Sequence, residues 1–300
     1  MYERVTGGEE DTGVERAVEE LERGYLSAEQ IGSKAKAHAA DRRLVFWSTP
    51  TFEDRLFLWM VFDALRREEI PENRVATAEP TVPVSPQEED FYALRDLQLE
   101  ELVEGFDNLV YPKGIYIQAG ADLWQTFSSA SPRKFAISVP HTEKFFPQIT
   151  TVAENYGWMF PVAEGEDADR LKLSEFDREL LGALGEGGWQ TPFDVLGGEF
   201  VERFHFVDDL AVAARLHAWS DAGEEAAYLD RRPADRPAGL FERHEFRITD
   251  RATEMLDRGI REEDDVPILE LGDCRIYASN NPWAKIVEGE HWWFERFELG

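Results

Sequence analysis

The residues best suited to chemistry in this chain are the hydroxyl side chains Ser48, Thr49 and Thr51 in the turn "STPT". They follow the apolar run "LVFW" at residues 44–47 and precede a longer apolar run. In an open α/β sheet, the carboxyl end of a strand and the amino end of the next helix form the usual ligand-binding edge. Free backbone amides and the helix dipole there favour an anion. The turn is therefore a candidate site for a phosphorylated or nucleotide-like ligand.

The same turn also has a purely structural interpretation as a helix cap. Thr51 can cap the following helix, and Asp54, three residues further on, can complete a capping box. The turn contains no glycine that would let the backbone approach a phosphate, and no basic residue. We favour the cap, and we keep Ser48, Thr49 and Thr51 as the ligand-binding alternative.

Other reactive groupings in the sequence are absent or weak. No phosphate-binding glycine loop and no G-x-S-x-G nucleophile motif occurs. The single cysteine, Cys274, lies in "LGDCRIYA", which is typical of a strand, so we expect a packed core thiol. His205, Asp208, Asp209 and His217 could assemble a metal site, but in so acidic a chain such groupings are usually solvated surface. We predict no metal and no cofactor, and no catalytic residue can be named.

The elements that must position the turn predict a small α/β domain. The run "LVFW" is typical of a strand buried on both faces, as in a parallel sheet. Residues 52–65 are apolar around most of the helical circumference, which predicts a helix packed between layers. A second strand near residues 74–78 leads into a proline-rich loop. We place this domain at residues 14–163, with mostly helices after residue 90.

A second domain is expected at residues 171–299, after the acidic linker candidate 164–170. Ser174, with Asp177 three residues on, and Pro192 mark two helix starts. A third helix, a strand and a closing helix follow, an order typical of a winged helix. The tail, residues 267–299, alternates in "ILELGDCRIYA" and in the aromatic "HWWFERFEL", which predicts two strands of a small sheet or hairpin. The expected fold class is thus helix-rich α/β, with a small parallel sheet followed by a winged-helix-like domain and a short β tail.

The charge balance restricts the partners. The chain has 32 Lys and Arg against 61 Asp and Glu, for a net charge of −29. Such a surface repels nucleic-acid phosphates and anionic lipids, and it also fits a protein kept soluble in high salt. The predicted recognition helix, residues 207–219, carries Arg215 as its only basic side chain against two aspartates. The basic residues around the wing that could contact nucleic acid are Arg231, Arg232, Arg236, Arg243 and Arg247.

These features disfavour a nucleic-acid partner. We predict a protein partner or self-association, through the winged helix or through the aromatic tail. The start of the sequence has no signal-peptide pattern, and the longest apolar run, "LFLWMVF", is too short to cross a bilayer. A single cysteine excludes a disulfide within the chain. We expect a cytoplasmic protein without membrane contact.

The order of several motifs carries a resemblance to a known family. Over residues 15–299 the chain shows "LVFWSTPTFEDRLFLWMVFDAL", "LQLEELVEGF", "LWQTFSSASP", "LSEFDRELLGAL", "FRITDRATEMLDRG" and "NPWAKIVEGEHWWFERFEL". This succession resembles the bacterial domain-of-unknown-function 1835 family. The resemblance implies a strand–turn–helix, a later winged-helix-like part and an aromatic terminal strand, and it implies no activity.

The chain departs from that family at two places. Proteins of the family begin with a strand that ends in a Gly-Asp-Ser turn, and this tripeptide does not occur here. Their later turn is often acidic, whereas this chain has Ser48, Thr49, Pro50 and Thr51. If those positions form the family's site, this chain lacks most of it. We therefore predict a non-catalytic regulatory or protein-interaction module. An enzyme or binder of a small anionic ligand at 48–51 is the alternative, and DNA binding through the winged helix is a weaker one.

Overall fold

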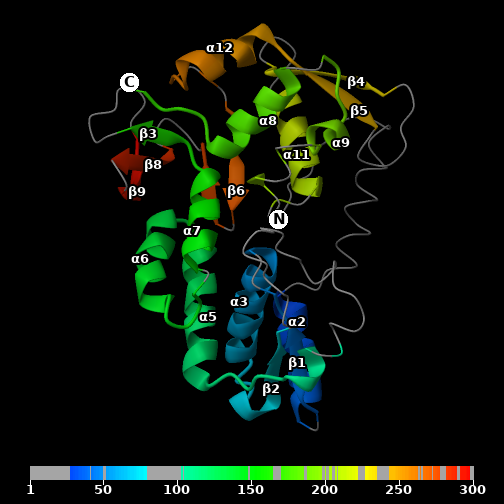
Figure 1. Cartoon of the computed structure of the whole chain (residues 1–300), viewed down its shortest axis with the longest axis vertical. Helices are drawn as coiled ribbons and strands as arrows, with labels where there is room; N and C mark the ends of the chain where they lie inside the picture. The colour runs from blue at the N-terminus through cyan, green and yellow to red at the C-terminus, as the bar shows by residue number, and fades with distance from the viewer. Residues whose placement is uncertain are drawn as a thin grey trace. The chain divides into compact units, whose positions relative to one another are not determined.

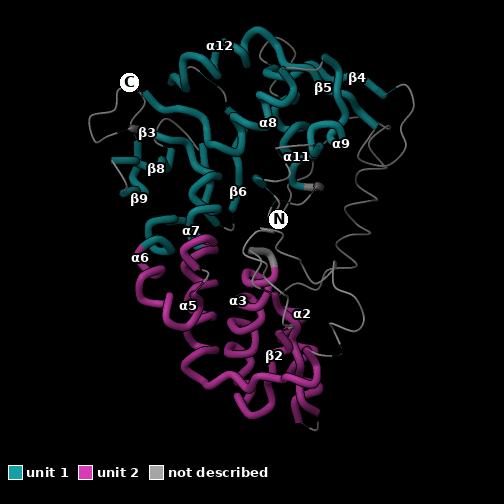
Figure 2. The backbone as a smooth tube through the Cα atoms, in the orientation of Figure 1, with its two compact units in different colours: residues 1–17, 129–136, 153–300 teal, residues 18–128, 137–152 magenta. Residues whose placement is uncertain are grey.

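The computed structural model describes residues 28–297 except for the gaps listed at the end of this sentence: 41, 50–51, 80–102, 104, 148, 165–169, 186–187, 198–199, 201–202, 205–206, 208, 222–226, 235–242, 263, 265, 272, 278–281 and 289–290. The chain divides into two compact units, shown in Figure 2. Unit 1 comprises residues 1–17, 129–136 and 153–300, and unit 2 comprises residues 18–128 and 137–152. The domain boundary that the sequence places at residues 164–170 stays a prediction.

Unit 2 contains a strand–helix–strand arrangement around the turn. Among its described residues, β1 (Leu44–Trp47) pairs in parallel with β2 (Val75–Ala78), so that Leu44 lies opposite Val75 and Trp47 opposite Ala78. Parallel strands need a crossover connection, and here it is α3 (Phe52–Arg67) followed by the short helix η1 (Glu72–Arg74). The two predicted strands and the apolar helix between them are confirmed, but β1 is half-buried at all four positions and not buried on both faces as predicted, whereas β2 is buried throughout.

Two further helices cover α3. Both α2 (Ala28–Ala39) and α5 (Gly114–Phe127) contact it, and Figure 1 shows α3 and α5 side by side. The close approach of α5 occurs at Gly120, where a Cβ atom would lie 2.5 Å from Cδ2 of Phe62. Phe62 and Trp59 are fully buried. Packing on more than one side explains why α3 is apolar around most of its circumference.

The helices α6 (Pro132–Thr142) and α7 (Ile149–Trp158) contain residues of both units. In unit 1, the end of α7 joins an aromatic core with the chain's last strand. The rings of Tyr156, Phe160 and Phe294 lie 4.5–5.8 Å apart between centroids. All three side chains are almost completely buried. This cluster is the hydrophobic centre on which the terminal strands pack.

Those terminal strands form two small sheets within the described part of unit 1. β8 (Trp283–Glu288) pairs in parallel with β3 (Val162–Glu164) and antiparallel with β9 (His291–Arg296). A second hairpin joins β6 (Leu269–Leu271) to β7 (Cys274–Ile276). The predicted strand in "HWWFERFEL" is β9, but the stretch "ILELGDCRIYA", predicted as one strand, is the β6–β7 hairpin, and β8 is a further strand that the sequence prediction lacks. Cys274 is a packed core thiol, as predicted, and burial raises its pKa to about 12.

The middle of unit 1 places helices against a hairpin. Helices α8 (Glu175–Gly185), α9 (Pro192–Val195) and α11 (Asp209–Ser220) are followed by antiparallel β4 (Leu229–Pro233) and β5 (His244–Ile248), and then by α12 (Asp250–Arg258). Gln190, between α8 and α9, forms a β-bridge with Phe246 of β5. The bridge ties the helical segment to the hairpin.

The observed elements confirm the helix-rich α/β class with small sheets. No helix in the described part of the chain combines the length and the apolarity needed to cross a membrane.

Candidate functional site

The turn after β1 faces inward. Ser48 and Thr49 have no exposed surface. The Ser48 amide donates to the Ala78 carbonyl at 3.1 Å, and the Ser48 hydroxyl donates to the Thr49 carbonyl at 3.2 Å. The Thr49 amide and hydroxyl both donate to Oδ2 of Asp54, at 3.2 and 2.5 Å. These donors serve local structure, and the Asp54 carboxylate accepts from Thr49, so the predicted cap by Thr51 stays a prediction. Thr51 lies outside the described residues.

Beside the turn lies a charged cluster that the sequence analysis does not single out. Arg55 is in the first turn of α3, Glu79 directly follows β2, and Tyr116 is in the first turn of α5. Arg55 is only 5% exposed, and its Nη1 donates to Oε1 of Glu79 at 3.4 Å. Burial raises the pKa of Tyr116 to about 12, with Glu79 adding to the rise and Arg55 opposing it. The Tyr116 hydroxyl therefore remains protonated at neutral pH.

One sequence signal could have identified this cluster. A cation in the first turn of a helix meets the positive end of the helix dipole, which is an unfavourable position. Arg55 stands there, four residues after the turn. An arginine kept at such a position indicates a negatively charged partner. Glu79, which supplies one, is too far along the chain for the sequence alone to pair with it.

The arginines around the β4–β5 hairpin are joined to acidic side chains. Arg231 lies 3.0 Å from Asp221, Arg232 2.6 Å from Glu245, and Arg247 2.5 Å from Asp230. Arg243 directly precedes β5, and Arg236 lies outside the described residues. The structure therefore brings three of the predicted nucleic-acid contacts onto one hairpin, but each of these three charges already has a carboxylate beside it.

The same hairpin holds an aromatic side chain between two of these cations. The guanidinium carbons of Arg232 and Arg247 lie 4.4 and 4.7 Å from the ring centre of Trp189. Such cation–π contacts add stability to a hairpin that is otherwise mostly polar. They also hold the two guanidinium groups in place on the protein, which leaves them less able to reach phosphates.

Arg215, the one basic side chain of the predicted recognition helix, points into the core. It is 3% exposed and donates to both carboxylate oxygens of Asp177, at 2.7 and 2.9 Å. Asp177 also accepts from Trp219 at 3.0 Å and from Ser174 at 3.0 Å. Burial alone would raise the pKa of Asp177, but the charge and hydrogen bonds of Arg215 outweigh burial and lower it. This network is structural, and it removes Arg215 from any surface contact.

His217 on α11 is an uncharged histidine packed against the hairpin. Its ring centroid lies 5.1 Å from those of both His244 and Phe246, and its Nδ1 lies 2.8 Å from Nη1 of Arg231. Burial lowers the pKa of His217 to about 4, with Arg231 and His244 lowering it further. At neutral pH the ring accepts a hydrogen bond from Arg231 and carries no charge.

This histidine predicts a pH dependence of stability. Because the folded state disfavours the protonated ring, the unfolded chain binds the proton first, and stability falls as pH drops from about 6.5 towards about 4. We expect a loss of about 2 kcal/mol over this range, below the full value of the pKa shift because the ring is partly exposed. Denaturant titrations of the wild type and of His217→Gln measure it. The variant should lack this component, and equal pH slopes in the two proteins would contradict the assignment.

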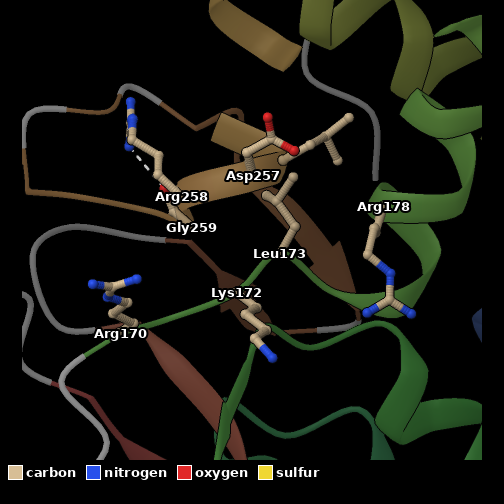
Figure 3. A pocket seen from close by; sticks show the side chains of 8 residues that line it. Arg170, Lys172, Leu173, Arg178, Asp257, Arg258 and Gly259 are labelled. Atoms are coloured by element: carbon tan, nitrogen blue, oxygen red, sulfur yellow. Dashed lines mark hydrogen bonds between the residues drawn. The ribbon is translucent and has the colours of Figure 1, made fainter. Parts of the chain in front are cut away.

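Unit 1 also contains a cavity of about 100 Å³ with basic residues around it, shown in Figure 3. Its lining includes Arg170, Lys172, Arg178, Asp257 and Arg258. The charged ends of the basic side chains point in different directions in Figure 3. Arg258 is held by Asp264 through two hydrogen bonds of 2.6 and 2.7 Å. The cavity therefore lacks the convergent donors that an anion site needs.

Within the described ranges, no three His, Cys, Asp or Glu side chains gather as metal ligands would. His205 and Asp208, which the metal hypothesis needs, lie outside these ranges. Comparison of the chain with protein-family models, with curated proteins and with solved structures finds no match. The relation to the domain-of-unknown-function 1835 family therefore stays a prediction.

Proposed function

We propose that this chain is a non-catalytic regulatory or protein-interaction module, and that α8 to β5 form a winged helix that contacts protein. The winged-helix assignment is supported by the order of the elements: α8, the bridge residue Gln190, the short α9, α11 and the β4–β5 hairpin. The observation that carries the functional proposal is the pairing of Arg231, Arg232 and Arg247 with carboxylates. Three of the five arginines proposed as DNA contacts are therefore already paired within the protein.

Energetics supports protein contact over DNA contact. Phosphate contacts supply most of the affinity of a DNA-binding protein, and each needs a cation free to replace the DNA counterions. Here an arginine would have to leave its carboxylate, which would then face the DNA. Arg215 is buried on Asp177, and the net charge of −29 adds general repulsion. Each of these features makes DNA binding less favourable.

We propose α9 as the contact surface. Phe193 on this helix is 68% exposed, the largest exposed fraction among the described large hydrophobic side chains. Pro192 and the capping residue Thr191 fix the start of the helix, so the ring projects from a rigid base. Exposed aromatic side chains are enriched in protein interfaces and bury much surface when a partner covers them.

The acidic surface supports adaptation to high salt, and the single cysteine supports a cytoplasmic location.

Two measurements test this proposal in low and in high potassium chloride. Fluorescence anisotropy with a labelled DNA duplex should show no saturable binding at protein concentrations up to about 10 μM in 50 mM salt. A photo-crosslinking amino acid at position 193 should trap a second copy of the chain or one discrete protein partner. The same group at position 115, where Ile115 is 62% exposed on α5, serves as the control.

Sedimentation velocity on the uncrosslinked protein then measures the affinity of the association that crosslinking detects. Phe193→Asp should weaken it at least tenfold, and Ile115→Asp should leave it unchanged. Saturable, salt-dependent duplex binding would overturn the proposal in favour of a DNA reader. An association that Phe193→Asp does not affect would remove α9 from the interface.

A further inference from the structure

We infer that Arg55 binds the carboxylate of a small ligand at the carboxyl edge of the β1–β2 pair, with Tyr116 beside it. This site is separate from the interaction surface proposed for unit 1. It also differs from the hydroxyl site that the sequence suggests, because Ser48 and Thr49 use their side chains internally.

Arg55 is a buried cation whose hydrogen-bonding capacity is only partly used. The Arg55 side chain is 7% exposed, and its contact with Glu79 is 3.4 Å long. Charge-assisted hydrogen bonds between such groups are ordinarily about 2.7–2.9 Å long. Its Nε atom is buried, and no described residue accepts a hydrogen bond from it. A buried guanidinium donor without an acceptor is costly, so this edge of Arg55 is suited to an acceptor brought by a ligand.

A second buried polar atom without a described partner, the Thr77 hydroxyl, lies on β2. The Thr77 hydroxyl is buried and has no hydrogen-bond partner among the residues that the structure describes. Thr77 lies on β2 two residues before Glu79, so strand alternation directs both side chains to the same face. Ligands bind open parallel sheets at the carboxyl ends of their strands, where Arg55 and Glu79 both lie.

The charges around Arg55 favour a carboxylate ligand over a phosphate. Glu79 contacts Nη1 of Arg55, and the Nε edge of the guanidinium matches the two oxygens of a planar carboxylate. Asp54, bonded to Thr49, adds a second negative charge on the neighbouring residue. A phosphate carries about two negative charges at neutral pH and would meet both carboxylates with one cation in reach. A carboxylate carries one charge, so the repulsion is about half as large. The protonated Tyr116 hydroxyl is a further possible donor.

The test uses the full chain with acetate as the probe and potassium chloride to hold ionic strength constant. For a fragment of this size we expect a Kd of about 1 mM. The thermal unfolding midpoint should then rise saturably, by about 5 °C at 100 mM acetate. Inorganic phosphate at the same ionic strength should produce a smaller shift.

Three variants make the test specific. Arg55→Lys keeps the charge but loses the forked edge, and it should raise the acetate Kd at least tenfold. Arg66→Lys on the same helix, where Arg66 pairs with Asp122 at the surface, should bind acetate as the wild type does. Tyr116→Phe should raise the Kd about threefold, and it provides a second reading if Arg55→Lys does not fold. The inference is overturned if the wild type shows no saturable shift, if Arg55→Lys responds equally, or if phosphate shifts the midpoint more than acetate.

Discussion

Asp177→Asn is expected to lower the free energy of unfolding by about 4 kcal/mol. The aspartate has no exposed surface and compensates the buried Arg215 through two hydrogen bonds. Removing one partner of a buried ion pair leaves the other charge uncompensated, which typically costs about 3–5 kcal/mol. Urea titration followed by tryptophan fluorescence measures the change, because Trp219 itself donates to Asp177.

A matched surface pair provides the control for this substitution. Asp230 also pairs with an arginine, Arg247, but their side chains are 44% and 48% exposed. Asp230→Asn should cost less than about 1 kcal/mol. The double variant Asp177→Asn/Arg215→Met should recover part of the loss, because it removes the uncompensated charge. A cost for Asp177→Asn no larger than that for Asp230→Asn would show that the buried pair does not stabilise the fold.

The pH dependence of this pair has a definite sign. The pKa of Asp177 is lowered in the folded state, because Arg215 and the hydrogen bonds outweigh the effect of burial. Its stabilisation is therefore complete above the pKa of an unfolded aspartate, about 3.9, and is lost as pH falls through the lower folded value. The difference in stability between wild type and Asp177→Asn should shrink only below about pH 4.

Replacing Gly120 and Gly182 separately by alanine is expected to change the stability of the protein in opposite directions. Gly120→Ala should destabilise by about 2 kcal/mol or more, because its Cβ would lie 2.5 Å from Cδ2 of the buried Phe62. Gly182→Ala should stabilise by about 0.5–1 kcal/mol, because among the described residues no atom beyond the neighbouring helix backbone lies within 4 Å of its Cβ, and alanine is the better helix former. The opposite signs separate steric conflict between α3 and α5 from helix propensity.

Denaturant titration of both alanine variants measures these changes in free energy. Phe62→Leu combined with Gly120→Ala supplies a further check, since the smaller side chain makes room for the new methyl group. The double variant should then be more stable than the two separate losses predict. A stabilising Gly120→Ala would mean that α5 does not approach α3 as closely as the structure shows.

Local patterns in the sequence predict the fold well where the interacting residues are close along the chain. The run "LVFW" becomes β1, and the apolar segment after it becomes α3. The Asp177 amide donates to the Ser174 hydroxyl, as expected of an N-cap three residues before it, although the Ser174 amide donates to the Tyr277 hydroxyl and so does not complete a capping box. Capping and periodicity depend on a few neighbouring residues, which is why they can be inferred without a structure.

The buried ion pair and the residues of the candidate site were less predictable, because their partners are distant in the sequence. Asp177, in the first turn of α8, also binds Arg215, 38 residues later, and no local pattern indicates that pairing. Ser48 and Thr49 were placed correctly after β1, but their burial depends on packing from elsewhere in unit 2. Arg55 and Glu79, 24 residues apart, meet because the crossover helix returns the chain to the same sheet edge.

The parallel pairing of β3 with β8 has a consequence for how the protein is made. Val162 lies opposite Lys285, so the strand that completes β3 is synthesised more than 120 residues later. At about 5–20 residues per second, a ribosome needs about 6–25 s to produce that stretch. During this time the nascent chain carries β3 without its sheet partner, and closing so long a loop is also slow. The β3–β8–β9 sheet of unit 1 is therefore completed late in biosynthesis. In unit 2, β2 begins only 31 residues after β1 begins, so these two strands can pair early.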